Sequence, residues 1–227
     1  TYMMKSGEDE MFLGELQAGA KVNLVMVKNF KAYEVSTSVA GVSYEMPNMV
    51  LLAPFEYKGS ILEFSNPVFE NVTFQLYSDD ANGNRVGWLG VDVKLQNYKG
   101  HTYYVVTAPV YGSVSKPNDR RHHARVEVGM RGTLIVQESD QKREIEVCDI
   151  SAEGISFICE DDMALINRMC KITFSECING ENYDLAMECQ CVRKTEKGNK
   201  YFYGCRVNEQ SRLGLTYIYI KKIMSKN

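Results

Sequence analysis

The chain has 227 residues, of which 44% are hydrophobic and 24% charged, and its formal net charge is −3. This composition is that of one or two folded globular domains, and it excludes a disordered or fibrous chain. The charge excludes a generally basic nucleic-acid coat protein, and no apolar run approaches the roughly 18–20 residues of a membrane span. The first residues (TYMMKSGEDE) contain no apolar signal core, so we expect no export and a cytoplasmic location.

Cysteine and charge are distributed unevenly along the chain. All seven cysteines lie between positions 148 and 205. Residues 1–115 carry 8 Lys or Arg against 12 Asp or Glu, whereas residues 116–227 carry 18 against 17. This contrast predicts two domains, at 1–112 and 120–227, joined by a small, polar, Pro-containing linker at 113–119.

In chain order, the first half reads as short β-strands separated by turn residues. Apolar, β-branched and aromatic runs predict strands at 21–27, 40–44, 49–53, 60–64 and 72–77. The sequence Asn82-Gly83-Asn84 is typical of a tight hairpin turn, and further strands are predicted at 86–93 and 101–106. Strands this short and evenly spaced are typical of a barrel or a sandwich.

The second half also reads as strands, and it ends in a helix. The predicted strands are 125–128, 133–137, 144–148, 154–159, 171–177, 185–192 and 201–207. The last two flank a hairpin turn at 196–199. Leu213, Tyr217, Ile220 and Met224 recur at helical spacing and predict a terminal helix over 209–224. The expected fold class is therefore mostly β, with a helix at the carboxyl end.

No pattern in the sequence singles out a catalytic or metal centre. The phosphate loop, Gly-x-Gly-x-x-Gly, His-Glu-x-x-His and Gly-x-Ser-x-Gly are all absent. His122 and His123 are adjacent, so on a strand they would point to opposite faces. Cys189 and Cys191 would share one face of a strand, and they read as small core residues because zinc sites prefer tight Cys pairs. We expect no enzyme activity, no metal and no cofactor.

A cluster of arginines and a polar turn form the constellation that points to a ligand. Arg120, Arg121 and Arg125 follow the linker, and the turn Asp149–Gly154 (Asp-x-Ser-x-x-Gly) follows 24 residues later. Each piece alone reads as a solvated segment or as an ordinary turn, in which the glycine would supply a positive φ. Together they fit a guanine nucleotide. Arginine pairs with guanine O6 and N7 or with phosphate, and the aspartate can accept hydrogen bonds from guanine N1 and its 2-amino group.

This arrangement resembles the PilZ domain, the bacterial receptor domain for cyclic di-GMP. The family signature is Arg-x-x-x-Arg followed by [Asp/Asn]-x-Ser-x-x-Gly. The resemblance covers about residues 117–227, including the Gly204-Cys205-Arg206-Val207 strand and the terminal helix, and it implies a six-stranded β-barrel. Residues 10–112 are similar in length and strand pattern to the amino-terminal domain of YcgR-type flagellar brake proteins. That similarity implies a split-barrel-like β domain, hence two β-barrel domains in tandem.

The resemblance implies a cytoplasmic bacterial receptor that binds cyclic di-GMP without turning it over. Binding would change the arrangement of the two domains and regulate flagellar motility or a related output. The implied protein partner is a flagellar motor component, with recruitment to the flagellar basal body, and neither nucleic-acid binding nor membrane insertion is expected. An additional arginine before the signature would help to hold a stacked pair of ligands. The expected ligand-binding residues are Arg120, Arg121, Arg125, Asp149, Ser151 and Gly154.

Three alternatives stay open at this level. The chain could be a degenerate PilZ module that binds proteins but no nucleotide, an enzyme on a β-barrel scaffold, or a nucleic-acid binder on a barrel. Titration with cyclic di-GMP, analysis of reaction products and salt-dependent DNA binding separate them. Arg193 is expected to lie outside the ligand site.

Overall fold

The computed structural model describes residues 10–115, 125–137, 139 and 141–225. The chain forms two compact units, of which the first contains Thr1–Pro54 and Leu62–His122 and the second Phe55–Ile61 and His123–Asn227. Residues 55–61, which we predicted in the first domain, therefore fold with the second unit. Strand β10 (Gly112–Ser115) pairs with a strand of the first unit. The predicted linker is therefore wrong at residues 113–115, and its remainder lies outside the described residues.

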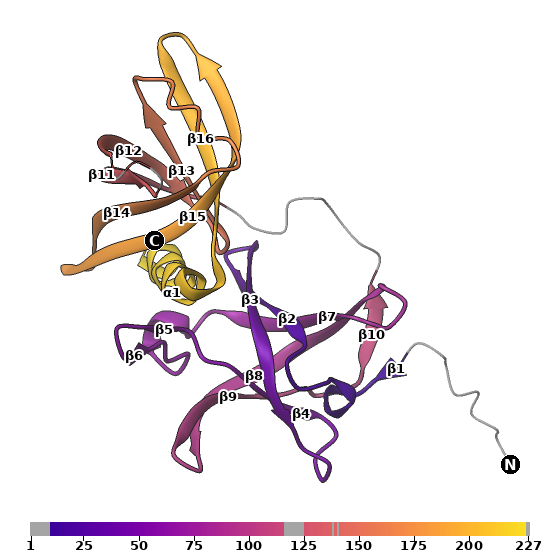
Figure 1. Cartoon of the computed structure of the whole chain (residues 1–227). Coiled ribbons are helices and arrows are strands. Elements are labelled where there is room, and N and C mark those ends of the chain that lie inside the picture. The colour runs from indigo at the N-terminus through magenta and orange to yellow at the C-terminus, as the bar shows by residue number, and fades with distance from the viewer. Residues whose placement is uncertain (1–9, 116–124, 138, 140, 226–227) are drawn as a thin grey trace, which may run out of the picture. The chain divides into compact units, whose positions relative to one another are not determined.

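The first unit is an antiparallel sheet that closes on itself (Figure 1). Its strand order is β1-β10-β8-β7-β2-β3-β4-β9, and β8 also pairs with β9. Strands β3 and β8 are long, and each changes partner along its length: β3 leaves β2 for β4, and β8 leaves β7 for β9. The ring that results is the split-barrel-like domain we expected. The elements are β1 (Glu10–Met11), η1 (Leu13–Glu15), β2 (Lys21–Lys28), β3 (Lys31–Val42), β4 (Met49–Leu52), η2 (Pro67–Phe69), β7 (Thr73–Asp79), β8 (Arg85–Tyr98), β9 (His101–Thr107) and β10.

Most of strand β3 was missed by periodicity, because its buried face carries polar side chains. Glu34, Ser36 and Thr37 are all buried. Ser36 donates to Asn23 Oδ1 at 2.8 Å, and Thr37 donates to a backbone carbonyl at 2.7 Å. Arg85 lies 3.0 Å from the Glu34 carboxylate. Buried polar groups are tolerated when they are hydrogen-bonded in this way, so apolar periodicity did not identify this part of the strand.

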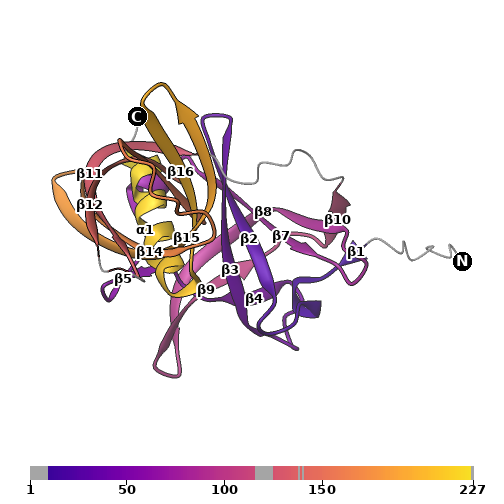
Figure 2. The ribbon, with the colours of Figure 1, turned by 45° about the horizontal axis from the view of Figure 1, so that its top comes forward.

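The second unit is built on a closed six-stranded barrel in the order β11-β12-β13-β16-β15-β14 (Figure 2). This confirms the six-stranded barrel and the terminal helix. The strands predicted at 125–128 and 133–137 are one strand, β11, which is bulged between Glu127 and Met130, where Gly129 has a φ of +64°. The elements are β5 (Glu56–Tyr57), β6 (Ser60–Ile61), β11 (Val126–Val136), β12 (Lys142–Ile150), β13 (Gly154–Cys159), β14 (Met169–Ile178), β15 (Glu181–Lys197), β16 (Lys200–Val207) and α1 (Glu209–Ser225).

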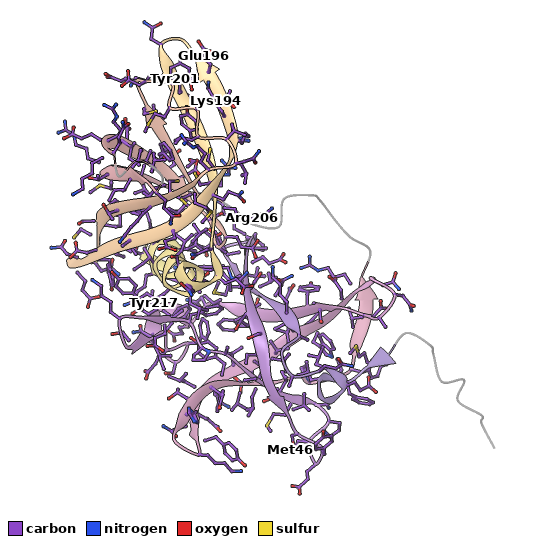
Figure 3. All side chains as sticks on the ribbon, viewed as in Figure 1. Met46, Lys194, Glu196, Tyr201, Arg206 and Tyr217 are labelled. Atoms are coloured by element: carbon purple, nitrogen blue, oxygen red, sulfur yellow. The ribbon has the colours of Figure 1, made fainter. Side chains whose placement is uncertain are left out.

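Helix α1 lies across one end of this barrel (Figures 1 and 2). It begins after Asn208, whose side-chain oxygen accepts a hydrogen bond from the Ser211 amide at 2.9 Å, as an N-cap residue does. Six consecutive residues, 215–220, are buried, so the helix is covered on more than one side. The barrel covers one side, and the β5–β6 hairpin covers another through Tyr57, whose ring stacks on Tyr217 with centroids 5.9 Å apart. Figure 3 labels Tyr217 on the helix. Within the described residues, no helical segment combines the length and apolar character that a bilayer span requires.

A buried ion pair fastens the last turns of α1 to strand β14. Lys222 Nζ lies 2.8 Å from Glu176 Oε1, and the two side chains are only 12% and 7% exposed. The other carboxylate oxygen of Glu176 is buried without a hydrogen-bond partner. The carboxylate therefore depends on the lysine, because removing one member of a buried pair leaves an uncompensated charge.

We expect Lys222→Met to lower the free energy of unfolding by about 3–5 kcal/mol, because it leaves Glu176 buried and unpaired. The double variant Glu176→Leu/Lys222→Met should recover most of this loss. The matched control is Lys221→Met, which breaks a more exposed pair with Glu181 and should cost at most about 1 kcal/mol. Urea denaturation measures all three, and equal losses for the two single variants would contradict the assignment.

Candidate functional site

Four of the six predicted ligand residues meet at one open pocket of about 290 Å³ on the second unit. Arg125 directly precedes β11, and Asp149 lies near the end of β12. Ser151 and Gly154 belong to the turn that leads from β12 into β13. The fold thus brings together residues that are 24–29 positions apart in the sequence. The other two predicted residues, Arg120 and Arg121, lie outside the described residues.

The turn between β12 and β13 is held from three directions. Ser151 donates its backbone N–H to the Gly154 carbonyl at 2.9 Å, which closes the turn. The Ala152 carbonyl accepts a hydrogen bond from the Thr216 hydroxyl of α1 at 3.1 Å, and Ala152 itself is buried. The Glu153 carbonyl accepts the Val207 N–H of β16 at 3.0 Å. This side of the pocket is therefore a fixed element of the barrel.

Gly154 is required for space and not for backbone conformation. The positive φ expected at this position is wrong, because Gly154 is not among the described glycines with positive φ. A Cβ atom here would lie 3.0 Å from the Cys205 carbonyl oxygen and 3.4 Å from the Ser151 hydroxyl. Strands β13 and β16 approach so closely at this point that only glycine fits without a shift of the backbone.

An ion pair joins the two predicted motifs across the pocket. Arg125 Nη1 lies 3.5 Å from Asp149 Oδ1, and the two side chains are 55% and 22% exposed. A pair this exposed contributes about 0–1 kcal/mol, because water solvates both charges. The arginine can therefore exchange the carboxylate for another anion at little cost.

The far wall of the pocket consists of residues that sequence reasoning missed. Val192, Arg193, Gly204 and Arg206 line it from the β15–β16 hairpin (Figure 3 labels Arg206). Arg193, which we expected to lie outside the ligand site, therefore lines this pocket. The hairpin turn predicted at 196–199 is shorter in the structure, where Lys197 pairs with Lys200, and this register sets Arg193 opposite Gly204. No pattern in the sequence indicates that β16 lies beside β13, where Ser156 pairs with Gly204. The sequence therefore could not predict that the β15–β16 hairpin lines the same pocket as the turn.

The shape of this wall follows from a β-bulge and a glycine. The register of β15 shifts between Cys191 and Arg193, and Val192 is left 49% exposed beside the pocket. A Cβ atom on Gly204 would meet the Arg193 side chain at 3.6–3.9 Å, so the guanidinium lies over the glycine. A bulge re-aims side chains in this way. The wall offers an apolar surface, a flat backbone floor and a cation side by side.

The described charges of the pocket favour an anion. Three arginines, Arg125, Arg193 and Arg206, line it together with Asp149 and Glu153. The Glu153 carboxylate lies 3.8 Å from Arg212, so a cation outside the pocket offsets part of its charge. The remaining balance is positive, and arginine is the side chain best suited to grip phosphate and guanine edges.

The thiols nearest to the pocket are not activated nucleophiles. Burial, followed by the neighbouring carboxylates of Asp149 and Glu146, raises the pKa of Cys148 to about 11. Hydrogen bonds to Cys170, Cys189 and Cys191 raise the pKa of Cys205 well above its usual value. Both thiols stay protonated at neutral pH, and a protonated thiol is a poor nucleophile.

The second half of the chain matches a known protein family. Residues 119–218 match the family model described as the PilZ domain. A search of curated proteins found no match.

The fold of the chain is similar to those of several solved structures. The Bacillus subtilis inhibitor of motility (MotI/DgrA) is 14% identical with a TM-score of 0.41, and the alignment covers 93% of this chain and 100% of that one. The Borreliella burgdorferi PlzA protein, solved with c-di-GMP, is 11% identical with a TM-score of 0.37 (96% and 93% covered). YcgR from Escherichia coli, also solved with c-di-GMP, is 12% identical with a TM-score of 0.35 (88% and 82% covered).

We expect Gly154→Ala to lower the free energy of unfolding by about 1–3 kcal/mol, because the new methyl group meets the Cys205 carbonyl. The matched control is Gly204→Ala, whose methyl group would make ordinary contacts only and should change stability by less than about 0.5 kcal/mol. Thermal unfolding followed by circular dichroism measures both. Equal stability of the two variants would show that β13 and β16 are not in close contact at Gly154.

Proposed function

We propose that the PilZ domain of this chain binds cyclic di-GMP in the pocket between Arg125, the Asp149–Gly154 turn and the β15–β16 hairpin. The observation that carries the proposal is the meeting of Arg125 and Asp149 in one positively charged pocket, with their charged groups 3.5 Å apart. The two halves of the signature come from different parts of the sequence, and a shared pocket is what a common ligand requires.

Each wall of the pocket suits a different part of the ligand. Arg125 pairs with a phosphate or with the O6 and N7 edge of guanine, and the Asp149 carboxylate accepts from a guanine N–H group. The exposed side chain of Val192 provides an apolar surface for the face of a base. Arg193 adds a planar cation that can stack on the same base or pair with a phosphate.

The energies are sufficient for a receptor of ordinary affinity. Micromolar binding needs about 8 kcal/mol, and a good bidentate arginine–guanine contact is worth about 1–3 kcal/mol. The exposed Arg125–Asp149 pair costs little to open, so most of the new contact energy is retained. At about 290 Å³ the described pocket is close to the lower limit of typical ligand pockets, about 300 Å³. We propose that Arg120 and Arg121, which lie outside the described residues, also bind the ligand.

Isothermal titration calorimetry of the full chain with cyclic di-GMP should show saturable heat, and its stoichiometry gives the number of ligands per chain. Arg121→Ala, Arg125→Ala and Asp149→Ala should each weaken binding by about 5–150-fold, the equivalent of about 1–3 kcal/mol. We expect a loss within the same range for Arg193→Ala, because this residue lines the far wall.

The matched control is Arg143→Ala, which removes an exposed arginine of β12 that lines a different pocket and should leave the affinity unchanged. Absence of heat with the unaltered chain would overturn the proposal and favour a PilZ module that binds no nucleotide. Conversion of the ligand, detected by chromatography, would favour an enzyme.

The output that we propose is a change in the arrangement of the two units that regulates flagellar motility or a related process. Support comes from the place of the arginines in the chain. The described part of the first unit ends with β10 at Ser115, and β11 of the second begins at Val126, so the arginine segment lies in the connection between them. A ligand that binds this segment acts on the connection itself. A local change in charge, such as the binding of an anionic ligand, can in this way alter the arrangement of whole domains.

Small-angle X-ray scattering with and without saturating cyclic di-GMP should show a change in the radius of gyration or in the distance distribution. Arg125→Ala, at a ligand concentration that saturates only the unaltered chain, should show no change. Identical scattering curves for the unaltered chain with and without the ligand would contradict the proposed rearrangement. The binding proposal would be unaffected.

A further inference from the structure

The interior of the barrel holds a cluster of three thiols. Cys170 of β14, Cys189 of β15 and Cys205 of β16 have their Sγ atoms within 4.8 Å of one another. The Sγ atoms of Cys170 and Cys189 are 3.5 Å apart. All three residues are buried, with at most 5% of their surface exposed.

The register of three neighbouring strands explains this grouping. Cys170 and Cys189 are direct partners across β14 and β15, and Cys205 is the partner of Cys191 across β15 and β16. Cys189 and Cys191 are two positions apart, so both side chains point to the same face of β15, which is the interior of the barrel. The strands therefore hold the sulfur atoms together without help from a loop.

We propose that Cys170, Cys189 and Cys205 bind one thiophilic cation with a filled d shell, Zn²⁺ or Cu⁺. Thiolate sulfur is the ligand that both ions favour. With metal–sulfur bonds of about 2.3 Å, three sulfurs around one ion lie about 3.8–4.0 Å apart. The observed separations, from 3.5 Å to less than 4.8 Å, bracket this value. Small rotations of the side chains are enough to seat the ion.

Cysteine binds a metal ion as the thiolate. Binding therefore exchanges thiol protons for the metal ion and should be stronger at higher pH.

The fourth buried thiol distinguishes the two ions. Cys191 is fully buried and hydrogen-bonds with Cys205, but it lies outside the group of three. Structural zinc sites almost always have four ligands, so Zn²⁺ would require Cys191 to turn from its contact with the Arg193 carbonyl at 3.7 Å. Cu⁺ is satisfied by three sulfurs in a site without water. Loss of Cys191 should therefore weaken Zn²⁺ binding and leave Cu⁺ binding unchanged.

The test is an anaerobic titration of the reduced full chain with Cu⁺ and, separately, with Co²⁺ as an optical substitute for Zn²⁺. Each ion is presented in competition with a chromophoric chelator. We expect uptake of one equivalent of at least one of the ions, with sulfur-to-metal charge-transfer absorption and an all-sulfur first shell by X-ray absorption. Losing a ligand should cost more than the 10–100-fold of a lost outer partner, so Cys170→Ala and Cys189→Ala should each weaken uptake by more than about 100-fold.

The matched control is Cys177→Ala, which removes an exposed thiol from the same strand as Cys170 and should leave uptake unchanged. Circular dichroism of each variant establishes that the barrel is intact. If a variant does not fold, the metal uptake and the X-ray absorption spectrum of the unaltered chain test the proposal. Failure to take up either ion, or a first shell with nitrogen or oxygen donors, would show that the thiols serve only as small core residues.

Discussion

The pocket depends on how closely strand β13 approaches strand β16 at Gly154. A Cβ atom there would lie 3.0 Å from the Cys205 carbonyl oxygen, which is closer than an ordinary contact allows. The same contact brings the Glu153 carbonyl within hydrogen-bonding distance of the Val207 amide, and α1 secures the turn from below through Thr216. A larger residue at position 154 would therefore require the neighbouring backbone to shift by a few tenths of an ångström.

The site combines a rigid half with a half that can exchange partners. The turn is hydrogen-bonded to a strand and to a helix, and its Ala152 is buried. Arg125, in contrast, is 55% exposed and holds Asp149 through one weak ion pair. A rigid surface keeps its shape at no further entropic cost when a ligand arrives, whereas an exposed arginine can form new contacts.

Much of the fold could be predicted from the sequence, because short alternating runs and turn residues mark most strands locally. The terminal helix was confirmed at 209–225 against a prediction of 209–224. The failures have physical reasons. Strand β3 buries hydrogen-bonded polar residues, and apolar periodicity therefore did not identify most of this strand. The residues 55–61 join the second unit because Tyr57 packs on Tyr217 and Tyr183, contacts between parts of the chain that are more than 100 positions apart.

The candidate site was predictable only where it has a motif. The signature identified the turn and the arginines, but Arg193 and Gly204 reach the pocket through the neighbouring strands β13, β16 and β15, an order that the sequence does not encode locally. The thiol cluster has the same origin. None of its cysteines forms a closely spaced pair with another member, and only the lateral pairing of three strands brings their sulfur atoms together.

The assignment of residues 55–61 to the second unit determines which fragments of the chain contain all of that unit. The chain passes from one unit to the other at 54–55, at 61–62 and again at 122–123, so three connections join the two units. The hydroxyl of Tyr57 donates to the Asp184 carbonyl, and its ring lies against α1. A fragment that begins at Arg125 would therefore lack this hairpin and lose the contacts of Tyr57 with Asp184 and Tyr217.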